Sequence, residues 1–184
     1  MKRMNDPTMA RLMEELWRSD PRAPAALPYA VVDGARDGRI YPRVRDHHLT
    51  HACLFSGQLA PELVQAAPYL VPLARAASTR ELLELGWGAS WGILAASNVG
   101  LEELRRHFRT MLRVEDEAGK RYLFRFYDPR VLRGYLPTCT PSELRAFFGP
   151  IDRFLVESDD PTRLLSYSIR GTLLHTAMVD LASA

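Results

Sequence analysis

The sequence has few cysteines and no long apolar stretch, and each shortage excludes a class of protein. Its two cysteines, Cys53 and Cys139, are isolated in a chain of 184 residues, which is long enough to fold without a disulfide framework. No stretch approaches the roughly 18 apolar residues that a membrane-spanning helix needs. The charged N-terminus also lacks the apolar segment of a secretory signal. We therefore expect free thiols, a cytoplasmic location and no contact with a membrane.

The sequence also has no large excess of positive or negative charge, since the formal net charge is only +2. All but two of the 24 basic residues are arginines, the exceptions being Lys2 and Lys120, and they are dispersed among acidic residues. Such a distribution gives no basic segment for a nucleic-acid backbone, so we expect no nucleic-acid partner. Arginine also pairs with carboxylates through two parallel hydrogen bonds and stacks on aromatic rings, which lysine does poorly.

Recognisable catalytic and metal-binding motifs are missing as well. The glycines of GWGASWG, residues 86–92, match neither the dinucleotide fingerprint nor the phosphate-binding loop. HHLTHAC, residues 47–53, offers three histidines and one cysteine, but the chain has no second pair of ligands to complete a zinc site. We expect no metal and no cofactor.

What the sequence does contain is an alternation of helix and strand patterns. It predicts a central mixed β-sheet of about five to six strands with one antiparallel hairpin, flanked by helices, which is an α/β fold. The expected helices cover residues 8–18, 78–85, 100–111, 129–134, 140–149 and 172–182. The expected strands cover residues 29–33, 69–71, 90–97, 151–158 and 163–170, and residues 112–114 and 122–127 are expected to form the hairpin.

Three segments follow from this pattern. Residues 1–26 are expected to form an amphipathic helix and a connector rich in proline and alanine, and residues 27–157 are expected to form the main α/β domain. Residues 158–184 are expected to form a strand and a helix. Whether that helix begins a second helical lobe is left open.

The stretch FRFYDPRVLRGYLP, residues 124–137, is the densest cluster of aromatic and charged residues. We predict a strand that stops at Asp128 and turns into a helix, with Asp128 as the cap and Pro129 in the first turn. Asp33 is also the last residue of a predicted strand. If the two strands run parallel, both carboxylates lie at one edge of the sheet, where α/β enzymes keep their sites. With Arg36, Arg125 and Arg130 nearby, a hydrolase or metal-assisted phosphoesterase is the alternative to a structural joint.

Several phrases occur in the order of a known family: PYAVVDGAR, LFSG, APYLVPL, GWGASWGILAAS, RFYDPRVL and FFGPI. Over roughly residues 28–156, the chain resembles the effector chaperone, or adaptor, domain of type VI secretion systems, long known only as a domain of unknown function. The resemblance implies a cytoplasmic protein without enzymatic activity that binds a type VI effector protein and assists its loading onto the VgrG spike protein.

The resemblance supplies no catalytic residues, and its signature falls on Asp33, Asp128 and Pro129. For partner binding the sequence suggests exposed aromatic and arginine side chains, which are common at protein interfaces. The candidates are Arg125, Tyr127, Arg130, Trp87 and Trp91. Two alternatives stay open: the tryptophans pack inside the fold, and Arg125 forms an internal ion pair with Asp33 or Asp128. A structural subunit of the secretion machine is a third hypothesis.

Overall fold

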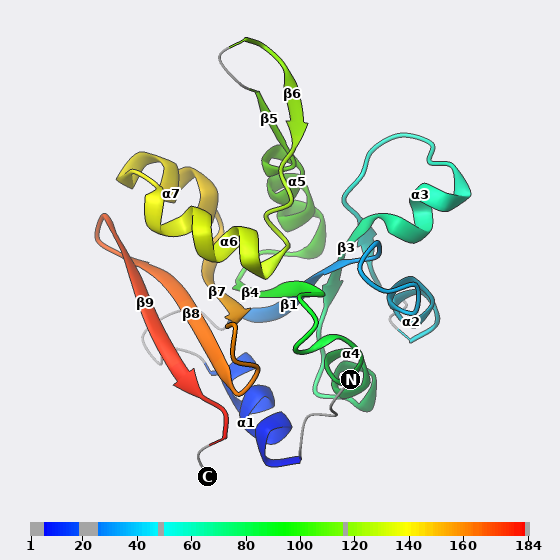
Figure 1. Ribbon diagram of the computed structural model, residues 1–184, viewed down its shortest axis with the longest axis vertical. Helices are drawn as coiled ribbons and strands as arrows, with labels where there is room; N and C mark the ends of the chain where they lie inside the picture. The colour runs from blue at the N-terminus through cyan, green and yellow to red at the C-terminus, as the bar shows by residue number, and fades with distance from the viewer. Residues whose placement is uncertain (1–5, 19–25, 48–49, 116–117, 183–184) are drawn as a thin grey trace.

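The computed structural model describes residues 6–18, 26–47, 50–115 and 118–182, and helices and strands alternate in it as far as residue 115 (Figure 1). The helices are α1 Asp6–Leu16, α2 Ile40–His47, α3 Pro61–Ala66, α4 Ala77–Gly86, α5 Leu101–Met111, α6 Pro129–Tyr135 and α7 Pro141–Phe148, with one 3-10 turn, η1 Leu136–Thr138. The strands are β1 Leu27–Asp33, β2 Ala52–Cys53, β3 Pro68–Pro72, β4 Gly92–Ser97, β5 Arg113–Glu115, β6 Arg121–Leu123, β7 Ile151–Glu157, β8 Arg163–Arg170 and β9 Leu173–Asp180. The predicted α/β class is confirmed. No helix within the described ranges is long and apolar enough to cross a bilayer.

The main sheet has the strand order β2-β3-β1-β4-β7-β8-β9, and β5 pairs only with β6 in a separate hairpin. Within the described residues every strand pairing is antiparallel. The predicted mixed sheet is therefore wrong, and its seven strands exceed the prediction. One reason is that β7, β8 and β9 follow one another through short turns, which only antiparallel neighbours allow.

Both faces of the sheet are covered, which gives three layers. Along β1, Tyr29 and Val31 point into one core, and Ala30 and Val32 point into the other. The first core is filled from helices α5, α6 and α7, and the second from α1, α2 and α4 (Figure 1). All six residues of β4 are buried, as the sequence predicted for a central strand.

The C-terminal segment is a strand and not the predicted helix. Arg170 pairs with Leu173 across a two-residue loop, in which Gly171 has φ +64°. A glycine in the left-handed region is what a tight hairpin loop needs, so the chain reverses and β9 pairs along all of β8. The segment joins the main sheet, and no second helical lobe starts within the described residues.

The hairpin strand is also shorter than predicted. β6 ends at Leu123, and residues 124–128 turn inward, with the N–H of Asp128 donating to the carbonyl of Arg125 at 3.0 Å. A strand over residues 122–127 would place Tyr122, Phe124 and Phe126 on one face, and the inward turn separates them. Tyr122 is 43% exposed on the hairpin, whereas Phe126 is fully buried.

Candidate functional site

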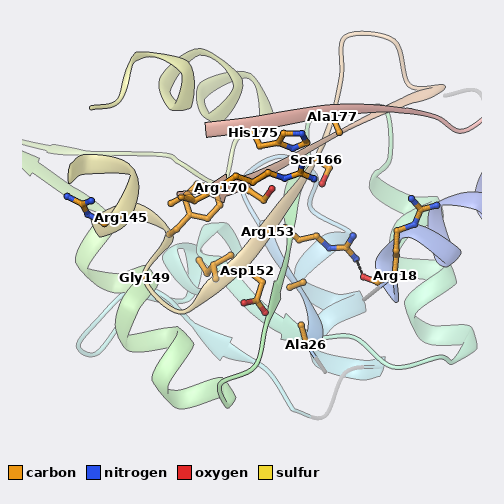
Figure 2. Close-up of a pocket in the computed structure, with 15 residues that line it drawn as sticks. Arg18, Ala26, Arg145, Gly149, Asp152, Arg153, Ser166, Arg170, His175 and Ala177 are labelled. Carbon is orange, nitrogen blue, oxygen red and sulfur yellow. Dashed lines mark hydrogen bonds between the residues drawn. The ribbon is translucent and has the colours of Figure 1, made fainter. Parts of the chain in front are cut away.

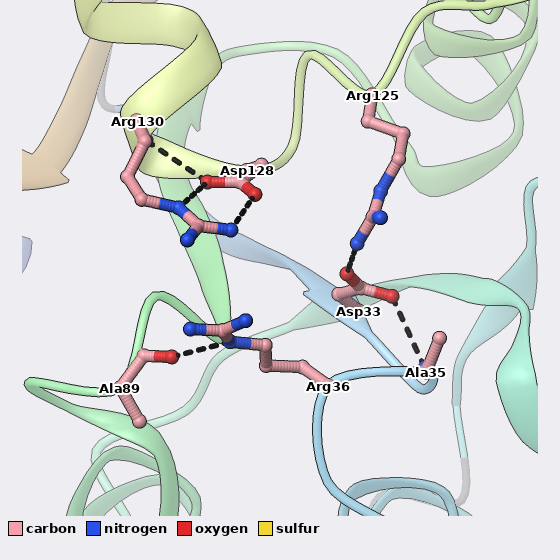
Figure 3. Close-up of polar contacts among 7 residues, drawn as sticks. All are labelled: Asp33, Ala35, Arg36, Ala89, Arg125, Asp128 and Arg130. Carbon is pink, nitrogen blue, oxygen red and sulfur yellow. Dashed lines mark hydrogen bonds and ion pairs between the residues drawn. The ribbon is translucent and has the colours of Figure 1, made fainter.

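Three segments that are far apart in the sequence, around Asp33, Ala89 and Asp128, meet in one polar cluster (Figure 3). Asp33 ends β1 and its side chain is almost fully buried. One carboxylate oxygen accepts the N–H of Ala35 at 3.1 Å, and the other accepts a guanidinium N–H of Arg125. Arg125 thus bridges from the segment before α6 to the end of β1, so of the two internal partners that the sequence left open, Asp33 is the one that it contacts.

Gly34, the residue after Asp33, is required by close packing. A Cβ at this position would lie 2.3 Å from the carbonyl oxygen of Gln65 and 2.7 Å from that of Ala67. The N–H of Gly34 also donates to the carbonyl of Ala67 at 3.1 Å. The Asp-Gly pair therefore lets the chain turn tightly against the segment before β3, and it fixes where the Asp33 carboxylate lies.

Asp128 caps a helix as the sequence predicted, although a turn and not a strand leads into it. It caps α6, accepting the N–H of Arg130 at 3.0 Å, and Pro129 occupies the first turn. The Arg130 guanidinium closes back on both oxygens of the same carboxylate, at 2.9 and 2.6 Å. Although burial acts to raise the pKa of Asp128, the hydrogen bonds from Arg130 hold that pKa below its ordinary value.

The loop between α4 and β4 forms the third side of the cluster. Arg36 donates from Nε to the carbonyl of Ala89 at 2.7 Å, and the N–H of Gly88 donates to Oε2 of Glu157 at 2.6 Å. Gly88 and Ser90 both have positive φ, and this conformation is uncommon for a residue such as Ser90. Two side chains from other elements therefore hold the loop in a strained shape.

Glu157, at the end of β7, is the residue of this cluster that the sequence analysis missed. It is 3% exposed, and its Oε1 has no hydrogen-bond partner among the described residues. Burial raises the pKa of this carboxyl, against the hydrogen bond from Gly88 and the positive charges of Arg133 and Arg36. Glu157 occupies a buried position at the end of the apolar run of β7, and a charged residue at such a position is the signal that could have identified it.

The remaining predicted contact residues lie inside the fold. Trp87 and Trp91 are buried against the second core, and Trp87 Nε1 donates to the carbonyl of Pro161 at 2.8 Å. Tyr127 is also buried, and burial raises its pKa to about 12. Packing is therefore the outcome for these three aromatic residues. Arg125 and Arg130 stay partly exposed, and a partner-binding role for them remains a prediction.

The arrangement required by the hydrolase hypothesis is not present at this cluster. β1 runs antiparallel to both of its neighbours, and Asp128 follows a turn and not a strand of the main sheet. Each carboxylate is buried and engaged by its own arginine. The described part of the chain also contains no cluster of three or more potential metal ligands, while His48 of the HHLTHAC stretch lies outside the described residues.

An apolar hollow lies on another part of the surface, beside the base of the β5–β6 hairpin. It has a volume of about 520 Å³ and is open to solvent. Its lining combines the LFSG phrase with the end of α5 and the hairpin: Leu54, Phe55, Ser56, Leu59, Arg109, Leu112, Arg113 and Leu123. Arg109 holds this phrase in place by donating to the carbonyls of Leu54 and Phe55 at 3.1 and 2.8 Å.

The Asp128 cap leads to a first prediction. Asp128→Ala removes the acceptor for the N–H of Arg130 and should lower the free energy of unfolding by about 1 kcal/mol. Asp128→Asn keeps a capping oxygen and should lose less. Thermal and urea unfolding measure both variants, and equal losses would contradict the capping role.

Glu157 leads to a second prediction, on pH. Because its pKa is raised in the folded protein, the native state holds this proton more tightly than the unfolded chain does. The wild type should therefore lose stability as pH rises through the raised pKa, and Glu157→Gln, which does not titrate, should not share that loss. Urea unfolding at about pH 4 and about pH 8 measures the free energy of unfolding of both proteins. The difference between variant and wild type should move in favour of the variant at the higher pH. Glu103→Gln, at an exposed position, is the control for losing one negative charge. If Glu157→Gln changes the free energy of unfolding by the same amount at both pH values, the raised pKa of Glu157 is contradicted.

Comparison with known proteins identifies the family. The model of a family described as "Domain of unknown function (DUF4123)" matches residues 28–146. Searches of curated proteins and of solved structures found no match. The matched range contains Asp33, the α4–β4 loop and the Asp128 joint, and it ends before Glu157, β8 and β9. Since it covers more than half of the chain, the protein belongs to the DUF4123 family.

Proposed function

We propose that the protein is a cytoplasmic adaptor that binds a type VI secretion effector and assists its loading onto the VgrG spike. The observation that carries the proposal is the family match over residues 28–146, which coincides with the phrases that resemble the effector adaptors. Under this proposal the protein acts by binding, without a cofactor and without catalysis.

The use that the fold makes of its signature residues supports the proposal. Arg125 ties the segment before α6 to Asp33 at the end of β1, and Arg130 closes locally on Asp128 at the start of α6. Arg36 separately joins the turn after β1 to the α4–β4 loop. A reacting carboxylate would need a free oxygen directed at a substrate, and neither aspartate is arranged in that way. The signature residues therefore stabilise a scaffold, as a binding module requires.

The apolar hollow beside the hairpin also supports a binding role. Five of its eight lining residues are leucine or phenylalanine, and Leu123 is 50% exposed. Leu54 and Leu112 form its buried floor, whereas Leu123 is accessible at its rim. A concave surface with an accessible apolar side chain is typical of sites that bind other proteins or ligands.

Copurification tests the proposal. The full chain carries an affinity tag and is expressed together with the effector and VgrG-like proteins encoded by neighbouring genes. We expect a stable complex with the effector, and a ternary complex when VgrG is present. Coexpression of the same tagged protein with effectors from unrelated gene clusters is the specificity control. If no product of a neighbouring gene copurifies, the adaptor function is contradicted.

A further inference from the structure

The outer edge of the sheet at β9 is open for pairing. β9 is the last strand of the sheet, and within the described residues no strand pairs with its outer side. It is eight residues long and contains no proline or lysine, the residues with which proteins commonly block an edge. Because β9 is hydrogen-bonded on one side only, alternate residues present their N–H and C=O groups outward. This edge can therefore accept a further strand.

The two faces beside this edge differ in character. Leu174 and Met178 lie on the face of the first core, where Leu174 is partly buried and Met178 is 60% exposed. His175 and Ala177 lie on the opposite face, across from Ser168 and Ser166 of β8. An incoming strand would thus meet mainly apolar side chains on the first face, which also carries Thr176. The second, polar face combines His175 with Ser166, Ser168 and Arg170 of β8, although Leu173 and Val179 of β9 also lie on it.

The polar face opens into a basic groove of about 680 Å³ (Figure 2). Its charged or titratable lining residues are Arg18, Arg145, Arg153, Arg170 and His175, with Asp152 as the acidic one. Two of these arginines are already engaged: Arg18 pairs with Glu15 at 2.8 Å, and Arg153 donates to the carbonyls of Glu15 and Leu16 at the end of α1. Arg145 and Arg170 are exposed, and among the described residues neither guanidinium has an ion-pair partner.

We infer that β9 and the basic groove together bind an extended acidic segment of a protein partner by strand addition. The segment pairs with the backbone of β9, directs acidic side chains toward Arg170 and His175, and directs apolar side chains toward Leu174 and Met178. Backbone hydrogen bonds provide affinity in this mode of recognition, and alternate side chains provide specificity. This inference rests on the proposed function, because it names how the effector or spike protein is held.

A second copy of the same chain fits this edge less well. Pairing β9 with β9 of another copy would bring the two basic grooves together on one face of a continuous sheet, with arginines near arginines. An acidic segment instead neutralises the groove. The charge of the lining therefore favours a different chain as the occupant.

A peptide titration tests the inference. The probe is a fluorescein-labelled ten-residue peptide that alternates glutamate with valine, followed by fluorescence anisotropy with the full chain. We expect saturable binding to the wild type and no binding of two matched peptides, one with lysine for glutamate and one with proline at every second valine. The lysine peptide tests charge, and the proline peptide tests backbone pairing.

Charge reversal in the protein completes the test. The double variant Arg170→Glu, His175→Glu should weaken binding of the acidic peptide about tenfold or more. Arg106→Glu, on the exposed side of α5, is the control and should bind as the wild type does. Melting temperatures show that each variant is folded. The inference is overturned if the acidic peptide does not bind, if the charge-reversed variant binds it equally well, or if size-exclusion chromatography shows that β9 pairs two copies.

The outcomes separate this inference from the proposed function. If an effector copurifies equally with the wild type and the charge-reversed variant, the adaptor function stands and the groove is not its site. If no partner copurifies while the peptide binds as expected, the proposed function fails and the acidic-segment site stands.

Discussion

Phe126→Ala should destabilise the protein by about 3–5 kcal/mol, the largest loss expected from any single substitution considered for this chain. Phe126 is fully buried in the first core. Its ring stacks on Phe108 with centroids 5.3 Å apart, and it contacts Tyr127 and Phe147 edge-on at 5.6 and 6.2 Å. Truncation removes the central ring of this aromatic cluster and leaves a cavity that α5 and α7 cannot fill without moving. Urea unfolding followed by far-UV circular dichroism measures the loss.

Tyr122→Ala is the matched control for this prediction. Tyr122 lies four residues earlier in the same aromatic segment, but its side chain is 43% exposed and its ring contact is with Lys120. The loss should stay below about 1 kcal/mol. Similar losses for the two variants would mean that the hairpin folds back on the core in solution, contrary to the structure.

Much of the helical part of the fold could be predicted from local sequence. α7 begins with Thr140, Pro141 and Glu143, and the structure contains the full capping box that this pattern predicts. Along α5, Leu104, Phe108 and Met111 are buried as their spacing indicates. Such signals lie within a few residues of one another, so they do not depend on the tertiary fold.

The strands at the C-terminus show where local reasoning is insufficient. Leu173, Leu174, Ala177, Met178 and Leu181 have helical spacing, yet Gly171 and Thr172 make a tight hairpin loop after β8. The tertiary gain from pairing eight residues with β8 outweighs a modest helix preference. The two-residue loop containing glycine between two apolar runs was the signal that favoured a hairpin.

The site was predictable in part. Asp128 as a helix cap and Arg125 as one half of an internal ion pair follow from residue chemistry. That Arg125 pairs with Asp33 and not with Asp128 depends on how β1 meets the segment before α6. Glu157 belongs to the polar cluster only because β7 lies next to β4 and because the α4–β4 loop has the shape that brings Gly88 to it. These contacts join residues far apart in the chain, and a single sequence does not define such distances.

The ion pair between Asp33 and Arg125 gives the second large effect. Asp33 is 2% exposed in its side chain, whereas the Arg125 side chain is 44% exposed. Without Arg125, the buried carboxylate would retain only the N–H of Ala35 as a described hydrogen-bond donor. Removing one partner of a buried pair commonly costs about 3–5 kcal/mol, and the exposure of the arginine reduces this figure.

Arg125→Met should therefore lower the free energy of unfolding by about 2 kcal/mol, because it strands the Asp33 carboxylate away from water. Asp33→Asn removes that charge while keeping an oxygen for the N–H of Ala35, so adding it to Arg125→Met should recover part of the loss. A double-mutant cycle by urea unfolding measures the coupling, which should be about 1–2 kcal/mol. Arg39→Met is the control, since it breaks an arginine–aspartate pair on the surface with Asp37 and should leave the melting temperature unchanged. If the losses in the cycle simply add, the pair does not brace the joint, and Arg125 becomes available as a contact residue for the partner.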